Sequence, residues 1–303
     1  MATHQLSSSH LIYAMSAGNR PALRVRSGDR VVIETADCFE NQIRSESQDF
    51  GGLDWERINP ATGPIYIEEA EPGDILAVHI EKMELAPRGV MTTGPGLGVL
   101  GDELADNHIR MIQVSGGRVN LFGREVPTNP MIGVIGTAPS GDSPIPCGTP
   151  GDHGGNMDCK RITEGAILLL PVNVPGALFA LGDLHASMGD GEVAVCGVEI
   201  AGKVTVKLHV LKGLTWPTPM VVDAERVMTI ASAATLDEAA VMATKRMAHW
   251  MSGQTGISGA EAIFLLSAKG ELRICQVVDP LKTARMEFDR AWLEEMGISF
   301  GNL

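Results

Sequence analysis

The first 214 residues alternate short apolar runs with turn-forming Gly and Pro, and this pattern limits the possible folds more than any other feature. Runs such as Arg30–Thr35, Ile75–Glu81 and Ala166–Pro171 have the length and composition of strands. Turns such as Glu71-Pro72-Gly73-Asp74 separate them. The 35 glycines and 17 prolines allow many such turns. We therefore predict a mainly β core over residues 1–215.

Two features of this region bear on the path of the chain. The runs Val193–Ile200 and Lys203–Val210 flank Ala201-Gly202, which predicts a β-hairpin. Residues 85–108 are rich in Gly and weak in periodicity, so we expect a long excursion. Such an excursion could be a lid, a tunnel wall or an oligomer contact.

The pattern changes after Trp216-Pro217-Thr218-Pro219. Thr235 and Ser258 each precede a Glu by three residues, which predicts a capping box at the start of a helix. The elements expected beyond the Pro-rich segment are helices over Leu236–Met251, from Ser258 to about Ser267 and over Phe288–Met296, with a strand over Glu271–Val278. They predict an α+β subdomain, residues 216–303, packed on the core.

Charge and cysteine usage exclude several classes of protein. The net charge of −13 and the absence of a basic cluster argue against nucleic-acid binding. Five scattered cysteines without close pairing favour reduced thiols in a cytoplasmic protein over a disulfide framework. Met1–Ala14 has no basic segment before an apolar stretch, so we expect no signal peptide. The apolar runs are also too short to span a membrane.

Two segments place acids and an imidazole among glycines where apolar strands end. They are Thr149–Asp158 and Gly182–Glu192. Glycine lets the backbone turn sharply and approach a ligand, and Asp, Glu and His are ligands for divalent cations. Each segment alone could be an ordinary turn. Their joint presence after core strands predicts a site.

Asp37 and Glu34 form a third candidate, because they follow a strand and Asp37 lies close to Asn41. The competing interpretation is a pair of surface acids. Covalent nucleophiles are not indicated, since no Gly-x-Ser-x-Gly turn is present and Cys147 lies in a Pro-rich loop. The glycines at 94–98 lack the strand–turn–helix context of a dinucleotide site.

Several longer motifs together resemble the acetamidase/formamidase family over residues 23–290. The segments that carry the resemblance are Asn59–Ile67, Glu71–Val78, Met131–Gly136 with Ala138-Pro139, Gly154–Asp158, Gly182–Ala186, Gly189–Glu192 and Cys275–Pro280. The resemblance implies a fold of sandwich and barrel-like sheets with a small α+β C-terminal part. It also implies hydrolysis of formamide or acetamide to the carboxylate and ammonia, a bound divalent metal, and a homo-oligomer, for which we expect a dimer. Zinc is the expected ion and calcium the alternative.

A metal-dependent mechanism gives each candidate residue a role. We expect Asp37, Asp158 and His185 to bind the metal, and Glu192 or Glu34 to act as the general base. The backbone N–H groups expected at the developing oxyanion are those of Gly154, Gly155 and Asn156.

Two other functions remain compatible with the sequence. The oxygen-rich stretch from Asp183 to Glu192 would suit calcium in a binding module without catalysis, with His185 incidental. Alternatively, the same scaffold could hydrolyse a larger or cyclic amide such as a lactam. Ammonia release separates the first alternative from an amidase, and the volume of the cavity bears on the second.

Overall fold

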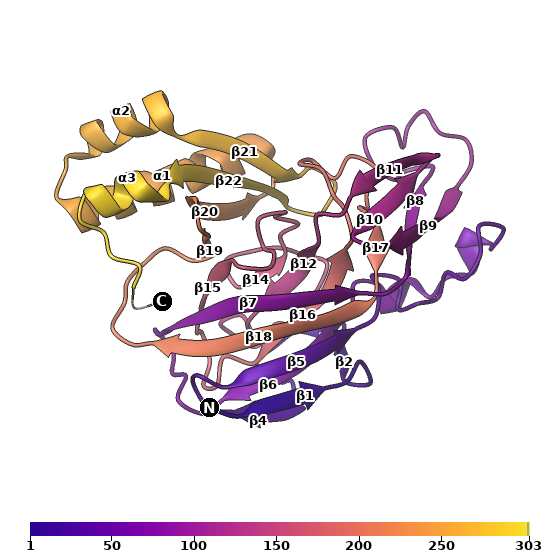
Figure 1. The fold of residues 1–303 in the computed structure, drawn as a ribbon, viewed down its shortest axis with the longest axis horizontal. Helices are drawn as coiled ribbons and strands as arrows, with labels where there is room; N and C mark the ends of the chain where they lie inside the picture. The colour runs from indigo at the N-terminus through magenta and orange to yellow at the C-terminus, as the bar shows by residue number, and fades with distance from the viewer. Residues whose placement is uncertain (302) are drawn as a thin grey trace.

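Two large β-sheets form the framework of residues 1–301 and 303, which the computed structural model describes (Figure 1). The nine-stranded sheet has the order β1 (Thr3–Leu6), β5 (Arg30–Thr35), β18 (Gly202–Leu211), β7 (Ile75–Leu85), β15 (Ile167–Pro171), β19 (Met220–Val222), β20 (Arg226–Ala233), β22 (Lys282–Asp289) and β21 (Glu271–Gln276). The eleven-stranded sheet follows β11 (Arg124–Pro127), β10 (Arg118–Leu121), β9 (His108–Ser115), β8 (Arg88–Thr93), β17 (Glu199–Ile200), β16 (Phe179–His185), β12 (Met131–Gly136) and β14 (Gly154–Asn156). Off this path, β6 (Ala61–Ile67) pairs with β16, β2 (Leu11–Ile12) and β4 (Leu23–Val25).

Short elements complete the fold. They are the two-stranded sheet of β3 (Ala14–Met15) and β13 (Ile145–Pro146), the 3-10 turns η1 (Phe50–Gly52) and η2 (Trp55–Arg57), and the helices α1 (Leu236–Thr255), α2 (Gly259–Lys269) and α3 (Arg290–Glu295). Figure 1 shows the three helices gathered beside β20–β22 at one end of the molecule. The expected fold class, mainly β with a small α+β C-terminal part, is confirmed. Within the described residues, no helix has the length and apolarity needed to cross a bilayer.

The nine-stranded sheet is buried on both faces where it meets the helices. Leu76 and Val78 of β7 pack into the core between the sheets, with residues of β16 such as Phe179. Ala77 and Leu169 face the other way, into a second core beneath α1. Because both faces exclude water here, the first four residues of β7 and the whole of β15 are continuous apolar runs and not alternating ones.

The hairpin predicted around Ala201-Gly202 is wrong. β17 pairs with β16 and β8, whereas β18 pairs with β5 and β7, so the chain crosses from one sheet to the other at this point. A Cβ on Gly202 would lie 2.6 Å from the carbonyl oxygen of Glu84 and 2.9 Å from a methyl group of Leu184. The glycine thus allows the backbone to pass close to Glu84 and Leu184 where the chain moves from one sheet to the other. A glycine between two apolar runs is also the sequence pattern of a hairpin turn, which explains the wrong prediction.

Three further boundaries differ from expectation or stay open. The excursion contains β8, which pairs with β9. The last helix begins at Arg290, because Phe288 completes β22 in the core. The division into 1–215 and 216–303 stays a prediction; β19 pairs with β15, so the same sheet continues across it.

The capping box of α1 makes a test of local stability. The Thr235 hydroxyl accepts a hydrogen bond from the Glu238 backbone N–H, and the Glu238 carboxylate accepts one from the Thr235 N–H. We expect Thr235→Ala to lower the free energy of unfolding by about 1 kcal/mol in urea titrations. Thr235→Ser keeps the acceptor and should match the parent. Equal stability of all three proteins would show that this cap does not contribute.

Candidate active site

The register of β16 and β17 places an imidazole against a carboxylate in the protein interior. His185 lies directly opposite Glu199 across the two strands, and its Nε2 is 2.7 Å from Glu199 Oε1. The neighbouring Leu184 points into the apolar core. Because side chains alternate along a strand, His185 points to the opposite side. Both His185 and Glu199 are 1% exposed, so this pair is almost completely removed from water.

Three more carboxylates surround the same imidazole. His185 Nε2 is 3.4 Å from Glu192 Oε1 and 3.8 Å from Asp183 Oδ1. His185 Nδ1 is 3.9 Å from Asp158 Oδ1. All three acids are buried. Four acids from separate parts of the chain therefore meet around one ring.

The backbone is strained at three of these four acids. Asp158, Asp183 and Glu192 have φ angles of 45°, 55° and 48°, in the left-handed region that residues with a Cβ rarely adopt. Each such residue costs about 1–3 kcal/mol and persists where the surrounding structure enforces it. Left-handed angles at three of the four acids therefore indicate that the surrounding structure enforces their placement.

Gly133 on β12 makes room for the cluster. A Cβ at this position would lie 2.5 Å from Asp158 Oδ1 and 2.6 Å from Asp183 Oδ2. It would also lie 3.0 Å from a ring carbon of His185. Any larger residue would separate the acids, so the absence of a side chain here is part of the site.

A cavity of about 110 Å³ opens above the cluster. Its polar wall includes Asn156, Asp183, Glu192, Glu199 and Asp279. The apolar wall consists of Phe39, Phe50, Trp55, Ile58, Leu97 and Val195. Leu97 belongs to the Gly-rich excursion, which therefore forms part of the cavity wall. The cavity combines a small apolar enclosure with an acidic floor.

Burial and the charges of neighbouring carboxylates make these acids hard to ionise, although His185 and Lys282 partly oppose the effect. Burial raises the pKa of Glu199 to about 8. Burial and the charge of Asp183 raise the pKa of Asp158 to about 6. Burial raises the pKa of Asp183, Glu192 and Asp279 well above the usual range, with neighbouring carboxylates adding to it. A cation placed among them would reverse this effect.

The donor atoms fit a divalent cation. Asp158, His185 and Glu192 bring ligand atoms within 4.8 Å of one another, and so do Cys38, Asp183 and Glu199. Among the described residues, no partner is found for either carboxylate oxygen of Asp158, for Asp183 Oδ1 or for Glu199 Oε2. Buried carboxylate oxygens without hydrogen bonds are costly, and metal coordination satisfies them. The residues of this structure therefore fit a bound metal.

Asp37, expected as a ligand, has a different local role. Its Oδ1 accepts hydrogen bonds from the backbone N–H groups of Phe39 (3.0 Å) and Asn41 (2.7 Å). These bonds close a turn of the Asx type. The turn presents the next residue, Cys38, to the cluster. Asp37 is close enough for its charge to contribute to the raised pKa of Asp183, after burial and other charges, but belongs to neither donor group.

Glu34 and two of the expected oxyanion donors lie outside the cavity. The Glu34 carboxylate is 2.7 Å from Lys203 Nζ, in a separate surface depression, and is 40% exposed. The Gly154 N–H donates to the carbonyl oxygen of Gly151, so it is already used. Gly155 is buried in β14 and is not part of the cavity wall, whereas Asn156 is.

Four site residues were absent from the predicted set: Cys38, Asp183, Glu199 and Asp279. Asp183 and Asp279 lie in motifs that the family resemblance already marked. Glu199 had a usable signal, because it is a single acid between Val198 and Ile200 in a run that is otherwise buried. Cys38 had none beyond its place next to Asp37.

Comparison with known proteins identifies the family. The model of the acetamidase/formamidase family matches residues 19–145 and 145–283, and the chain belongs to this family. A crystal structure of acetamidase from Bacillus halodurans is 48% identical, with a TM-score of 0.95 over 97% of this chain and 100% of that chain. The predicted acetamidase/formamidase of Thermoanaerobacter tengcongensis is 49% identical, with a TM-score of 0.96 over 99% and 100%.

Curated relatives are more distant. The acetamidase of Mycolicibacterium smegmatis is 28% identical over 262 residues, which cover 63% of this chain and 64% of that protein. The chain spans 61% to 64% of the length of the curated relatives it matches.

The buried acids predict how stability depends on pH when no metal is present. Burial raises the pKa of Glu199 from its ordinary value of 4.5 to about 8 in the folded state. Between these two pH values, the folded state therefore holds more protons than the unfolded state. The free energy of unfolding of chelated protein should therefore fall as pH rises from about 5 to about 8. Urea titrations at several pH values measure this. Glu199→Gln should flatten the slope; a slope equal to the parent's would contradict the assignment.

Proposed function

We propose that this protein is a metal-dependent amidohydrolase that cleaves small aliphatic amides, formamide or acetamide, to the carboxylate and ammonia. The observation that carries the proposal is the small cavity whose floor is a buried cluster of four carboxylates around His185. The names of its relatives, acetamidase and formamidase, support the same chemistry.

The size of the cavity favours a small linear amide. Pockets that hold drug-sized ligands have volumes of roughly 300–1,000 Å³. The 110 Å³ here is far smaller. Formamide and acetamide have few heavy atoms, whereas a lactam, which is larger, would fill more of this volume. The cavity therefore argues against the alternative of a larger or cyclic amide.

The two donor groups differ in their relation to the cavity. Cys38, Asp183 and Glu199 all line it, whereas of the second group only Glu192 does. A catalytic metal needs a position open to substrate, so we assign it to the first group, which leaves Glu192 free for proton transfer. When bound, the divalent metal polarises the amide carbonyl and lowers the pKa of a water. The sulfur of Cys38 in this group favours zinc over calcium, which prefers oxygen ligands alone.

Glu192 is the residue best placed to move protons. It lines the cavity, is buried and approaches His185 Nε2 to 3.4 Å. Amide hydrolysis requires a base that removes a proton from the attacking water and an acid that protonates the leaving nitrogen. One carboxyl group with a raised pKa can perform both steps in sequence. We assign both steps to Glu192.

Asn156 is placed to orient the substrate. Its Nδ2 donates to Asp279 Oδ2 at 3.1 Å, which fixes the direction of the amide group. Its Oδ1 is buried and has no partner among the described residues. Asn156 lines the cavity, and we assign its Oδ1 as the acceptor for the N–H of a substrate amide. This bond would direct the substrate nitrogen toward Asn156 and its carbonyl away from it.

The proposal also includes a cytoplasmic location and a homodimer. All five cysteines are buried free thiols, which suits a reducing compartment. The proposed number of subunits rests on the resemblance to the family. Light scattering would measure it directly.

The first experiment measures ammonia released from formamide, acetamide and a lactam before and after chelation. We expect turnover of a linear amide that falls with chelation and returns when zinc is added. If ammonia release is unchanged after exhaustive chelation and elemental analysis finds no metal, a metal-dependent mechanism is excluded. Bound metal without ammonia release from any amide would favour the non-catalytic binding module.

A matched pair of glutamate variants tests the proton-transfer role. Glu192→Gln keeps the shape of the side chain but cannot accept a proton, so kcat should fall by about two orders of magnitude or more. Bound metal should be retained if the first donor group holds the catalytic ion. Glu34→Gln, which changes an exposed acid of the same type, should leave kcat unaltered. A near-normal rate for Glu192→Gln would remove this residue from the mechanism.

A further inference from the structure

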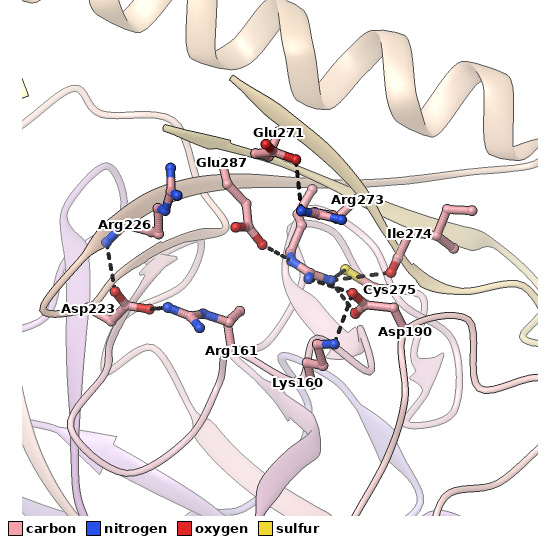
Figure 2. Close-up of polar contacts among 11 residues, drawn as sticks. Lys160, Arg161, Asp190, Asp223, Arg226, Glu271, Arg273, Ile274, Cys275 and Glu287 are labelled. Carbon is pink, nitrogen blue, oxygen red and sulfur yellow. Dashed lines mark hydrogen bonds and ion pairs between the residues drawn. The ribbon is translucent and has the colours of Figure 1, made fainter. Parts of the chain in front are cut away.

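Arg285 on β22 is a buried cation behind the site. It is 2% exposed, and both terminal nitrogens of its guanidinium donate hydrogen bonds to the Asp190 carboxylate, at 2.7 and 2.9 Å. Its Nε donates to Glu287 at 2.6 Å. Figure 2 also shows a contact between Asp190 and Lys160, whose Nζ lies 3.1 Å from Asp190 Oδ2. Arginine is almost never this deeply buried unless it is paired.

Asp190 lies in the turn that leads to Glu192, and the turn is attached to the end of β21. The Gly191 N–H donates to the Cys275 carbonyl at 2.9 Å, and the Val277 N–H donates to the Gly191 carbonyl at 3.1 Å. Backbone bonds thus hold the glycine, and Arg285 holds the neighbouring side chain. Glu192 follows directly, with its strained φ of 48°.

Asp279 depends on the same junction. The Gln276 side chain accepts hydrogen bonds from the N–H groups of Val278 (2.9 Å) and Asp279 (3.0 Å). Gln276 forms an isolated parallel bridge with Gly191. The turn that carries Glu192 and the loop that carries Asp279 are therefore joined where Arg285 and Asp190 meet.

We propose that the Asp190–Arg285 pair is a positioning device that holds Glu192 against the metal-binding cluster. The proposal rests on the proposed amidohydrolase function. Glu192 faces other carboxylates in a buried, strained conformation, and water would be the more favourable surrounding for its charge. The bidentate pair opposes that movement, because a shift of Asp190 would break two charge-assisted hydrogen bonds and leave the terminal nitrogens of a buried guanidinium without a carboxylate.

The competing explanation is a pair that only contributes to stability. Buried ion pairs are often no better for stability than apolar residues of similar size, so burial alone does not settle the role. The nearby pair of Arg161 and Asp223 provides the comparison. It lies in the same region of Figure 2, but Asp223 caps the turn before β20 through the N–H groups of Glu225 and Arg226. Asp223→Asn is therefore the matched control.

The test is a double-mutant cycle on kcat and KM for the amide that wild-type enzyme cleaves. Asp190→Asn, which is isosteric, should lower kcat roughly 10- to 100-fold, the cost of a displacement near 1 Å. KM should change much less than kcat, because Asn156 and the apolar walls of the cavity are untouched. Asp223→Asn should keep kcat within about twofold. In the Glu192→Gln background, Asp190→Asn should have no further effect beyond about twofold, because the group it positions is already disabled.

A second readout does not depend on activity. In a crystal structure of Asp190→Asn, the Glu192 carboxylate should have moved away from His185. Equal losses of kcat in both backgrounds, or an unmoved Glu192, would overturn the positioning role. Arg285→Lys keeps the charge but loses the bidentate grip, and should repeat the kcat loss. If neither variant folds, the pair is a stability element and the proposal is rejected. Wild-type protein that cleaves no amide instead overturns the proposed function, while the crystal structure still reports the position of Glu192.

Discussion

Mutual repulsion among buried carboxylates is the constraint on which the site depends. Asp158, Asp183, Glu192 and Glu199 surround one imidazole and are each 6% exposed or less. Without a compensating cation they resist ionisation, as their raised pKa values show. A fold that nevertheless brings them together must either keep them protonated or supply positive charge. The unpartnered oxygens and the two donor groups favour the second solution.

The scaffold accommodates this cluster at identifiable cost. Three of the four acids have left-handed backbone angles, and Gly133 lacks the side chain that would separate two of them. The sandwich core and the helix-covered face of the nine-stranded sheet provide the packing that holds these strained residues in place. The packing of the two cores thus offsets the backbone strain at the site. Residues far from the cavity therefore contribute to keeping the strained acids in place.

Local rules predicted what is local and failed where sheet pairing decides. The strands, both capping boxes and the acids in Gly-rich turns could be inferred from sequence, because turn and cap chemistry acts over a few residues. The sequence of Val198–Ile200 marks Glu199 only as a buried acid, since its position opposite His185 arises from the pairing of β16 with β17. Sheet pairing is also the reason why the predicted hairpin at Gly202 is wrong, because β17 and β18 pair in different sheets. Asp37 and Cys38 show the limit of inference from sequence. Asp37 was a predicted ligand, but its neighbour Cys38 belongs to a donor group of the cluster.

The cavity and the charges beneath it act together in the proposed chemistry. The buried side chains of Phe39 and Phe50 line the cavity and limit its contact with bulk water, which strengthens the electrostatic interactions inside. The same exclusion makes each carboxylate harder to ionise, so rigid placement matters more than in an open site. Glu192 shows both effects, because its burial raises its pKa and its strained turn limits its reach. A group of this kind needs support from outside the cavity, and the structure places a buried guanidinium directly behind its turn.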